Sequence, residues 1–126
     1  MATVDLDQLR LMTSGDAELA AEALAIFRSQ ADLWGRMLDG SGDRKAWTDA
    51  CHTIKGAARS VGAMELGDAC AHAEELGKSA DSTSARDGVA LSEVKDRLGE
   101  AIEAIASLEH QLLLTRSFDK LRVTEP

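Results

Sequence analysis

Proline interrupts helices more strongly than any other residue, and this chain holds only one proline, Pro126, at its last position. The chain also contains 21 alanines, the residue with the highest helix propensity, and no tyrosine. Aromatic residues make up 3% of the sequence, so the side chains that favour strands are scarce. The sequence therefore predicts an all-α fold and excludes an all-β one.

Length and charge narrow the classes of function. A chain of 126 residues fits one domain with its own core. The net charge of -8 argues against nucleic-acid binding, which requires a basic face. No run of about 18 apolar residues could span a membrane, and residues 1–10 lack the apolar core of a signal peptide. We therefore expect a cytoplasmic protein that binds neither nucleic acid nor a membrane.

Apolar residues at spacings of three and four predict two helices in the first third of the chain. A short helix is expected over residues 5–12, with Leu6, Leu9 and Met12 on one side. A longer helix begins after the capping residues Ser14 and Asp16 and ends at the turn cluster 39–43. Its predicted apolar stripe is Leu19, Ala23, Ile26, Phe27, Leu33, Trp34, Met37 and Leu38.

Three more helices follow by the same spacing. The first is predicted from about 43 to 61 and the second from about 64 to 78, with a turn at Gly62 between the two. The third is predicted to follow a polar loop at 80–88. The inward-facing residues of the first are Trp47, Cys51, Ile54, Ala58 and Val61. Those of the second are Leu66, Ala69, Cys70, Ala73 and Leu76. Those of the last are Leu91, Val94, Leu98, Ala101, Ile105, Leu108 and Leu112.

Four long helices with short connections predict an antiparallel up-down four-helix bundle, with the short first helix as an additional N-terminal element. The bundle domain is expected to cover residues 1–114. Residues 115–126 are charged and lose the apolar periodicity, so we expect a helix extension or a flexible tail there. Because one chain already supplies four helices, a monomer is expected.

A histidine on the helix at 43–61 points away from the predicted core. At about 100° per residue, His52 lies about 140° around this helix from Trp47, on the same surface as Gly56. Lys55 and Arg59 flank that pair. A glycine within a helix costs about 1 kcal/mol relative to alanine, so Gly56 requires a reason. Two reasons are open: close approach of a neighbouring helix, or clearance beside an exposed imidazole for a phosphoryl group or another protein.

The residues from His52 onward carry a resemblance to a known family. The order is His52-Thr53-Ile54-Lys55-Gly56, followed by Gly62, Leu66, Cys70 and Glu74. This resembles the histidine-containing phosphotransfer (Hpt) domain, whose pattern is H-x-x-K-G, a glycine ten residues after the histidine, and L-x-x-x-C-x-x-L-E. Ala73 departs from the pattern, where the family usually has Leu or Met.

The resemblance implies a phosphorelay intermediate within a helical bundle. His52 would accept a phosphoryl group from the aspartate of one receiver domain and pass it to another, with Lys55 and Gly56 part of the same site. An ordinary imidazole, with a pKa of about 6.5, is largely neutral and nucleophilic at neutral pH. By position, Glu74 would hold the second ring nitrogen, and Lys78 and Arg59 would add positive charge. The carrier would need no cofactor of its own and would not be a conventional enzyme, because the receiver supplies Mg²⁺.

Several alternatives stay open at this point. Glu74 could equally be a solvated helix carboxylate, and Arg59 and Lys78 could be solvated charges that only bias docking. A bundle that binds receiver domains without transferring phosphate is the alternative function. A dimerising hairpin of a histidine kinase is a third interpretation, which a monomer would exclude.

Two further expectations concern the surroundings of His52. A basic cluster is expected to favour an acidic receiver, with Ile26 and Phe27 as candidate apolar docking contacts. The members of this cluster are Arg44, Lys45, Lys55, Arg59 and Lys78. No metal site is expected, because the pairs Cys51–His52 and Cys70–His72 diverge on regular helices. Both cysteines are interpreted as small buried residues.

Overall fold

A computed structural model describes residues 4–39 and 43–123, except for the side chains of Leu6 and of residues 112–123. This part of the chain is helical and contains no strand, which confirms the all-α prediction. The helices are α1 (Leu6–Met12), α2 (Ala17–Met37), α3 (Arg44–Ser60), α4 (Met64–Lys78) and α5 (Ser84–Val123).

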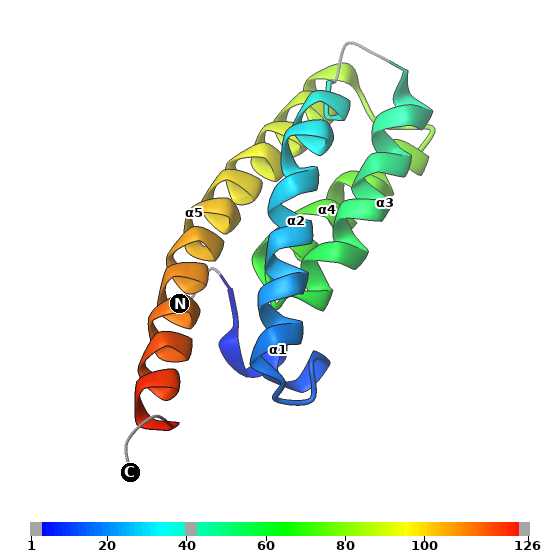
Figure 1. Ribbon diagram of the computed structural model, residues 1–126. Coiled ribbons are helices and arrows are strands. Elements are labelled where there is room, and N and C mark those ends of the chain that lie inside the picture. The colour runs from blue at the N-terminus through cyan, green and yellow to red at the C-terminus, as the bar shows by residue number, and fades with distance from the viewer. Residues whose placement is uncertain (1–3, 40–42, 124–126) are drawn as a thin grey trace.

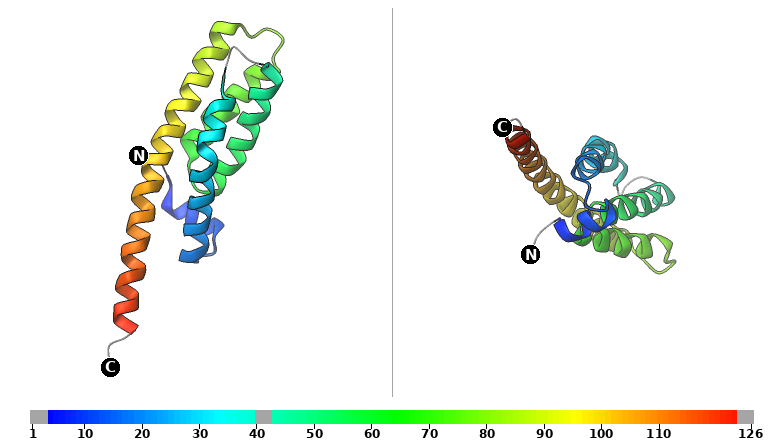
Figure 2. Two further views of the ribbon diagram at one scale, coloured as in Figure 1. Left: turned by 45° about the horizontal axis from the view of Figure 1, so that its top comes forward. Right: turned by 60° about the horizontal axis from the view of Figure 1, so that its bottom comes forward.

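The helices α2 to α5 lie side by side in a bundle, and α1 lies across one end of it (Figure 1). Helix α3 packs against α2 and α4, and α5 packs against α2 and α4, so the four helices enclose one core. The second half of α5 continues beyond the end of the bundle (Figure 2). No helix in the described ranges is long and apolar enough to cross a membrane.

Aspartate side chains begin the first three helices. Asp5, Asp16 and Asp43 each accept a hydrogen bond from a backbone N–H of the following turn, which satisfies donors that the helix leaves free. Asp16 is one of the two capping residues predicted from the sequence, while Ser14 adopts a positive φ of 54° in the turn before it. These local signals place the start of α2 one residue after Asp16.

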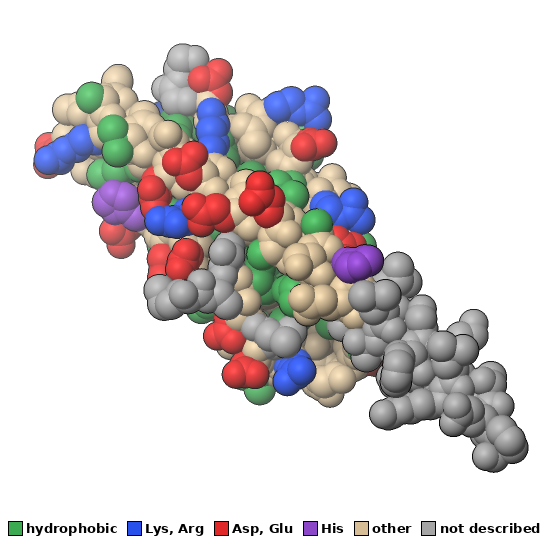
Figure 3. Space-filling model, turned by 90° about the vertical axis from the view of Figure 1, so that its left-hand side faces the viewer, with side chains coloured by type: hydrophobic (Ala, Val, Ile, Leu, Met, Phe, Trp, Pro, Cys, Tyr) green, Lys and Arg blue, Asp and Glu red, His purple; other side chains and the backbone are tan. Residues whose placement is uncertain are grey.

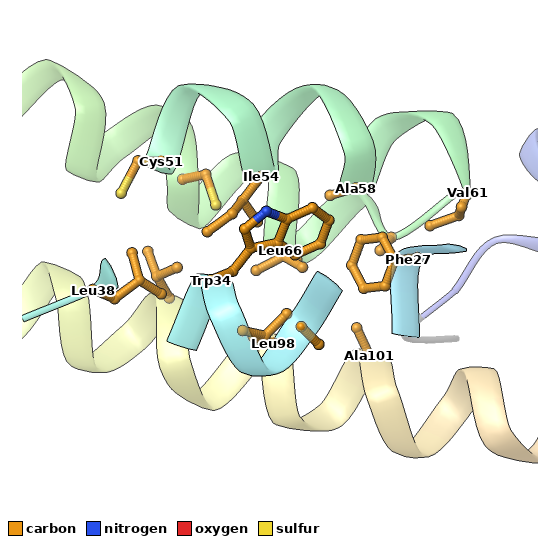
Figure 4. Packing of buried hydrophobic residues seen from close by; sticks show 14 of the residues in the cluster. Phe27, Trp34, Leu38, Cys51, Ile54, Ala58, Val61, Leu66, Leu98 and Ala101 are labelled. Atoms are coloured by element: carbon orange, nitrogen blue, oxygen red, sulfur yellow. The ribbon is translucent and has the colours of Figure 1, made fainter. Parts of the chain in front are cut away.

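The core predicted for α3 is confirmed. Trp47, Cys51, Ile54, Ala58 and Val61 are all buried. They face the buried side chains of the other long helices, and Figure 4 shows Ile54, Ala58 and Leu66 gathered around Trp34. The rings of Phe27 and Trp34 meet edge to face, with their centroids 5.1 Å apart. The same face of α3 therefore binds α2 and α4 together, as the periodicity indicated.

The apolar stripe predicted for α2 is wrong in half of its members. The buried residues repeat at spacings of three and four from Ala20 to Leu38. They are Ala20, Leu24, Phe27, Ala31, Trp34 and Leu38. Four predicted core residues are instead exposed: Leu19 at 46%, Ile26 at 63%, Leu33 at 48% and Met37 at 41%. Because α2 carries two adjacent apolar stripes, sequence spacing alone could not tell which one faces the core.

The start of α5 also differs from the prediction. The polar segment 80–88 was expected to be a loop, yet the helix begins at Ser84. The Oγ1 of Thr83 accepts a hydrogen bond from the Arg86 N–H at 3.2 Å, and the Thr83 carbonyl accepts one from the Asp87 N–H at 2.9 Å. A threonine cap therefore starts the helix inside the polar segment.

The other end of α5 extends far along the chain. Its backbone is helical through Val123, so residues 115–123 continue the helix rather than leave it. Residues 124–126 lie outside the described residues, as does the side chain of Leu112. The remaining seam residues from Leu91 to Ile105 are buried as predicted, and Leu108 is partly buried.

Candidate functional site

His52 lies on the outer surface of α3, facing α4. Its side chain is 68% exposed, although its neighbours Cys51 and Ile54 are fully buried. The Nδ1 atom lies 3.0 Å from Oε2 of Glu74 on α4. One ring nitrogen is therefore engaged by the protein, and the rest of the ring faces solvent.

Glu74 is a buried carboxylate that three side chains surround. Its side chain is 7% exposed. Lys55 Nζ donates to Oε1 at 2.6 Å, and Lys78 Nζ donates to Oε2 at 2.9 Å, beside the contact from His52. The hydrogen bonds from Lys55 and Lys78 lower the pKa of Glu74 from 4.5 to about 2, against the opposing effect of burial. Glu74 is therefore ionised throughout the physiological pH range.

The ionised carboxylate decides which tautomer His52 adopts. A carboxylate can only accept hydrogen bonds, so the contact at 3.0 Å requires a proton on Nδ1. In the neutral ring this leaves a lone pair on Nε2, which points away from Glu74 toward solvent. The arrangement thus presents an oriented nucleophilic nitrogen at the surface.

Two lysines hold the carboxylate from opposite ends of the site. Lys55 lies on α3 with its side chain 21% exposed, and Lys78 lies at the last turn of α4 with its side chain 68% exposed. Both ammonium groups compensate the charge of Glu74 and remain next to the imidazole. They are placed to offset negative charge that arrives at Nε2.

Arg59 lies one turn after Lys55 on α3 and contacts α4 by packing rather than by an ion pair. Its side chain packs over Gly67 of α4, where an added Cβ would lie 3.2 Å from Arg59 Cγ. Within the described residues, Arg59 forms no ion pair. It therefore leaves a free positive charge on the surface that carries His52.

A family model and a solved structure agree with this geometry. The model of the Hpt domain matches residues 5–111. The chain belongs to the Hpt family. It is also similar to the crystal structure of histidine phosphotransferase ShpA from Caulobacter crescentus, with 39% sequence identity and a TM-score of 0.72. That match covers 92% of this chain and 98% of the ShpA chain. No curated protein matches the chain.

Membership of the Hpt family supports a role in phosphotransfer within two-component signalling. At family level, Hpt proteins are phosphocarriers rather than conventional enzymes, and they interact with receiver domains. The resemblance drawn from His52 to Glu74 is thereby confirmed at the level of the family.

Gly56 of this Hpt domain has open space around it. A Cβ added there would meet no atom within 4 Å outside its own helix and chain neighbours. Close approach of a neighbouring helix, one of the two reasons considered for this glycine, is therefore wrong. Clearance beside His52 remains as the reason that fits the surface.

The basic cluster expected around the Hpt histidine is smaller than the sequence indicated. Arg44 Nη2 donates to Asp87 Oδ1 at 3.1 Å and to the Leu76 carbonyl at 3.0 Å, so it joins α3 to α4 and α5. Lys45 is paired with Asp49 at 3.0 Å. Arg44 is thus committed to the fold, a role that the sequence missed because Asp87 lies 43 residues away.

The two cysteines are core residues, as interpreted from the sequence. Cys51 and Cys70 are both fully buried and free. Burial raises the pKa of Cys51 to about 11 and that of Cys70 to about 12, so neither thiol is ionised at neutral pH. Within the described ranges, no group of three or more His, Cys, Asp and Glu side chains could hold a metal ion.

Proposed function

We propose that the chain is a phosphorelay intermediate that carries the phosphoryl group on Nε2 of His52. The contact between His52 Nδ1 and Glu74 Oε2 at 3.0 Å carries this proposal. With Glu74 as the acceptor, the proton would lie on Nδ1, which supports the exposed Nε2 as the nucleophile. Lys55, Lys78 and Arg59 support the site with positive charge, and Gly56 leaves room beside the ring.

The transfer step exchanges one phosphorus bond for another. The Nε2 lone pair attacks the phosphorus of an aspartyl phosphate on a receiver domain, and the bond from phosphorus to the carboxylate oxygen breaks. The receiver recovers its aspartate, and His52 becomes a phosphoimidazole that is positively charged on its ring, with Nδ1–H still donating to Glu74. A second receiver aspartate then attacks the same phosphorus and releases the neutral imidazole.

The Hpt chain needs little chemistry of its own for this exchange. The partner receiver would supply Mg²⁺ and much of the transition-state stabilisation, so the proposal assigns no cofactor to this chain. We also propose that the carrier is a monomer and that its four long helices follow an up-down order. Two contacts support an antiparallel pairing of α3 and α4: the earlier residue of α3, His52, meets the later residue of α4, Glu74, and Arg59 meets Gly67.

Exposed apolar side chains on α2 support a docking surface for the receiver. Leu19, Ile26, Leu33 and Met37 lie about 110° around α2 from its buried face. Arg28 lies on the opposite side, where it pairs with Glu109 of α5 at 2.7 Å. Because α2 packs between α3 and α5, the apolar stripe lies on the α3 side.

Two observations sharpen this docking surface. Ile26 is 63% exposed and stays a candidate contact, whereas the other sequence candidate, Phe27, is buried and is excluded. Several acidic side chains lie on the face of the molecule that carries α5 (Figure 3). An acidic receiver that docks at His52 would meet the positive charges of Lys55, Lys78 and Arg59.

A transfer assay with a phosphorylated receiver domain tests the proposal. We expect label to appear on the wild-type chain, to be acid-labile and base-stable, and to be absent from His52→Gln. His72→Gln is a matched control, because His72 is an exposed histidine on α4 outside this contact. If folded wild type binds receivers but takes up no label, the alternative of a non-transferring adaptor replaces the carrier.

Replacing Gly56 by alanine is expected to separate stability from transfer. The new methyl group meets open space and raises helix propensity, so the free energy of unfolding should rise by up to about 1 kcal/mol. The same methyl group narrows the clearance beside His52, so phosphoryl uptake from a receiver should fall. Denaturant unfolding and the transfer assay measure the two effects. Gly99→Ala, which also meets open space, should stabilise the chain without slowing transfer; equal transfer rates in both variants would contradict the clearance role.

A further inference from the structure

Helices α3 and α4 lie close together where Gly77 faces Thr48. A Cβ added to Gly77 would lie 3.0 Å from both Cβ and Cγ2 of Thr48, and closer still to its Oγ1. Thr48 is buried, and its Oγ1 donates to the Arg44 carbonyl at 2.7 Å, which fixes its rotamer. Rotation about χ1 could move Oγ1 away from position 77 only by giving up this hydrogen bond. Position 77 therefore has no room for a Cβ unless Thr48 or one of the two helices moves.

This close approach lies next to the carboxylate that orients His52. Gly77 follows Glu74 by three residues, so both lie on the side of α4 that faces α3. The same turn is held from α3 by the hydrogen bond from Arg44 Nη2 to the Leu76 carbonyl at 3.0 Å. A displacement of this turn would move Glu74 with it, because a helix moves as a rigid segment.

We infer that Gly77 is a positioning residue: its bare Cα against Thr48 sets the helix spacing that keeps Glu74 within hydrogen-bond distance of His52 Nδ1. Glutamate and histidine side chains have limited reach, so a wider spacing breaks their contact at 3.0 Å. Lys55 and Lys78 have longer and more flexible side chains and can follow the carboxylate. The tautomer of His52 is therefore the property most sensitive to this spacing.

A wider helix spacing would change both the tautomer of the His52 imidazole and the rate of phosphoryl transfer. In Gly77→Ala, the Nδ1 proton loses its acceptor, and the ring populates both tautomers. The consequence for transfer rests on the proposed function, whereas the consequence for the tautomer does not. A misplaced orienting group slows a group transfer by roughly 10- to 100-fold, which is the loss expected for phosphorylation of His52.

The test compares Gly77→Ala, Thr48→Ala and the double variant in the full chain. Thr48→Ala removes Oγ1 and Cγ2, the atoms that a new methyl group at position 77 meets beside the Thr48 Cβ. Nitrogen-15 NMR of the imidazole reports the tautomer of His52. Phosphoramidate serves as the phosphodonor, because its P–N bond is exchanged for the Nε2–P bond with release of ammonia and without a receiver. We expect Gly77→Ala to lose the Nδ1–H tautomer and the fast labelling, and the double variant to regain both.

Gly67→Ala is the matched control for this experiment. It makes the same substitution on the same helix and toward the same neighbour, but its new Cβ meets the flexible Arg59 side chain at 3.2 Å. That side chain can yield, so the tautomer should remain as in wild type. An unchanged tautomer in folded Gly77→Ala, or a double variant that is not rescued, overturns the inference. Failure of wild type to become labelled, with the tautomer still shifted by Gly77→Ala, overturns the proposed function instead.

Discussion

Replacing Glu74 by glutamine is expected to slow phosphorylation of His52 by about 10- to 100-fold, the usual loss when an orienting partner is removed. Glutamine keeps the shape of the side chain but removes the charge that Lys55 and Lys78 neutralise. Its amide can present either oxygen or nitrogen to His52, so the proton is no longer confined to Nδ1. Labelling kinetics with a phosphorylated receiver measure this loss.

The same substitution should change how stability depends on pH. The pKa of Glu74 is lowered from 4.5 to about 2, so its ionised form stabilises the fold fully above about pH 4.5. That contribution is lost as the pH falls from 4.5 toward 2, because the carboxylate takes up a proton. The pKa difference corresponds to roughly 3 kcal/mol as an upper bound. Denaturant unfolding of wild type and Glu74→Gln should therefore differ at pH 7 and converge near pH 2.

Glu75→Gln is the matched control for both effects. Glu75 is the next residue on α4 and is exposed, so its substitution changes the net charge equally without touching His52. It should leave the labelling rate and the pH dependence of unfolding as they are in wild type. If Glu74→Gln behaves like Glu75→Gln, Glu74 does not orient the imidazole.

Among the glycines that the structure describes, replacing Gly62 by alanine is expected to cause the largest loss of stability, more than about 2 kcal/mol. Gly62 has φ +82°, a conformation that costs other residues about 1 kcal/mol or more. A Cβ there would also collide with the backbone carbonyl oxygen of Asp5, whose N–H donates to the Gly62 carbonyl at 2.6 Å. Relief of the collision requires Asp5 to withdraw, which removes the cap of α1 from the bundle.

Gly15→Ala separates the two causes of this loss. Gly15 has a similar φ of +75°, but an added Cβ would meet no atom within 4 Å. Its substitution should therefore cost only the backbone strain, about 1 kcal/mol. Unfolding in denaturant measures both variants, and equal losses for Gly15→Ala and Gly62→Ala would show that the contact with Asp5 contributes nothing.

The accuracy of the sequence predictions depended on how far apart the interacting residues lie in the chain. On α3, polar and charged residues separate a single apolar stripe, so the buried face from Trp47 to Val61 and the outward direction of His52 were both predictable. On α2, apolar residues occupy two adjacent stripes, and Ile26 was assigned to the core although it is exposed. Periodicity identifies an apolar face but does not say whether protein or solvent covers it.

In the candidate site, too, contacts within one helix were predictable and contacts between helices were not. The spacing of His52, Lys55 and Gly56 lies within one helix, so the sequence was sufficient to group them. Position in the family pattern suggested Glu74, but its three donors and its low pKa follow only from the packing of α4 on α3. Arg44 was grouped with the surface charges because its partner Asp87 belongs to another helix.

The sequence by itself determined the helical class, the start of α2 at the Asp16 cap, the inward face of α3 and the exposure of His52. Each of these depends on residues within a few positions of one another, whose geometry the helix sets in advance. Only the tertiary structure decided which stripe of α2 is buried, which nitrogen of His52 carries the proton, and how closely Gly77 approaches Thr48. These depend on distances between separate helices, which arise from the packing of the whole core and are not encoded in any local pattern.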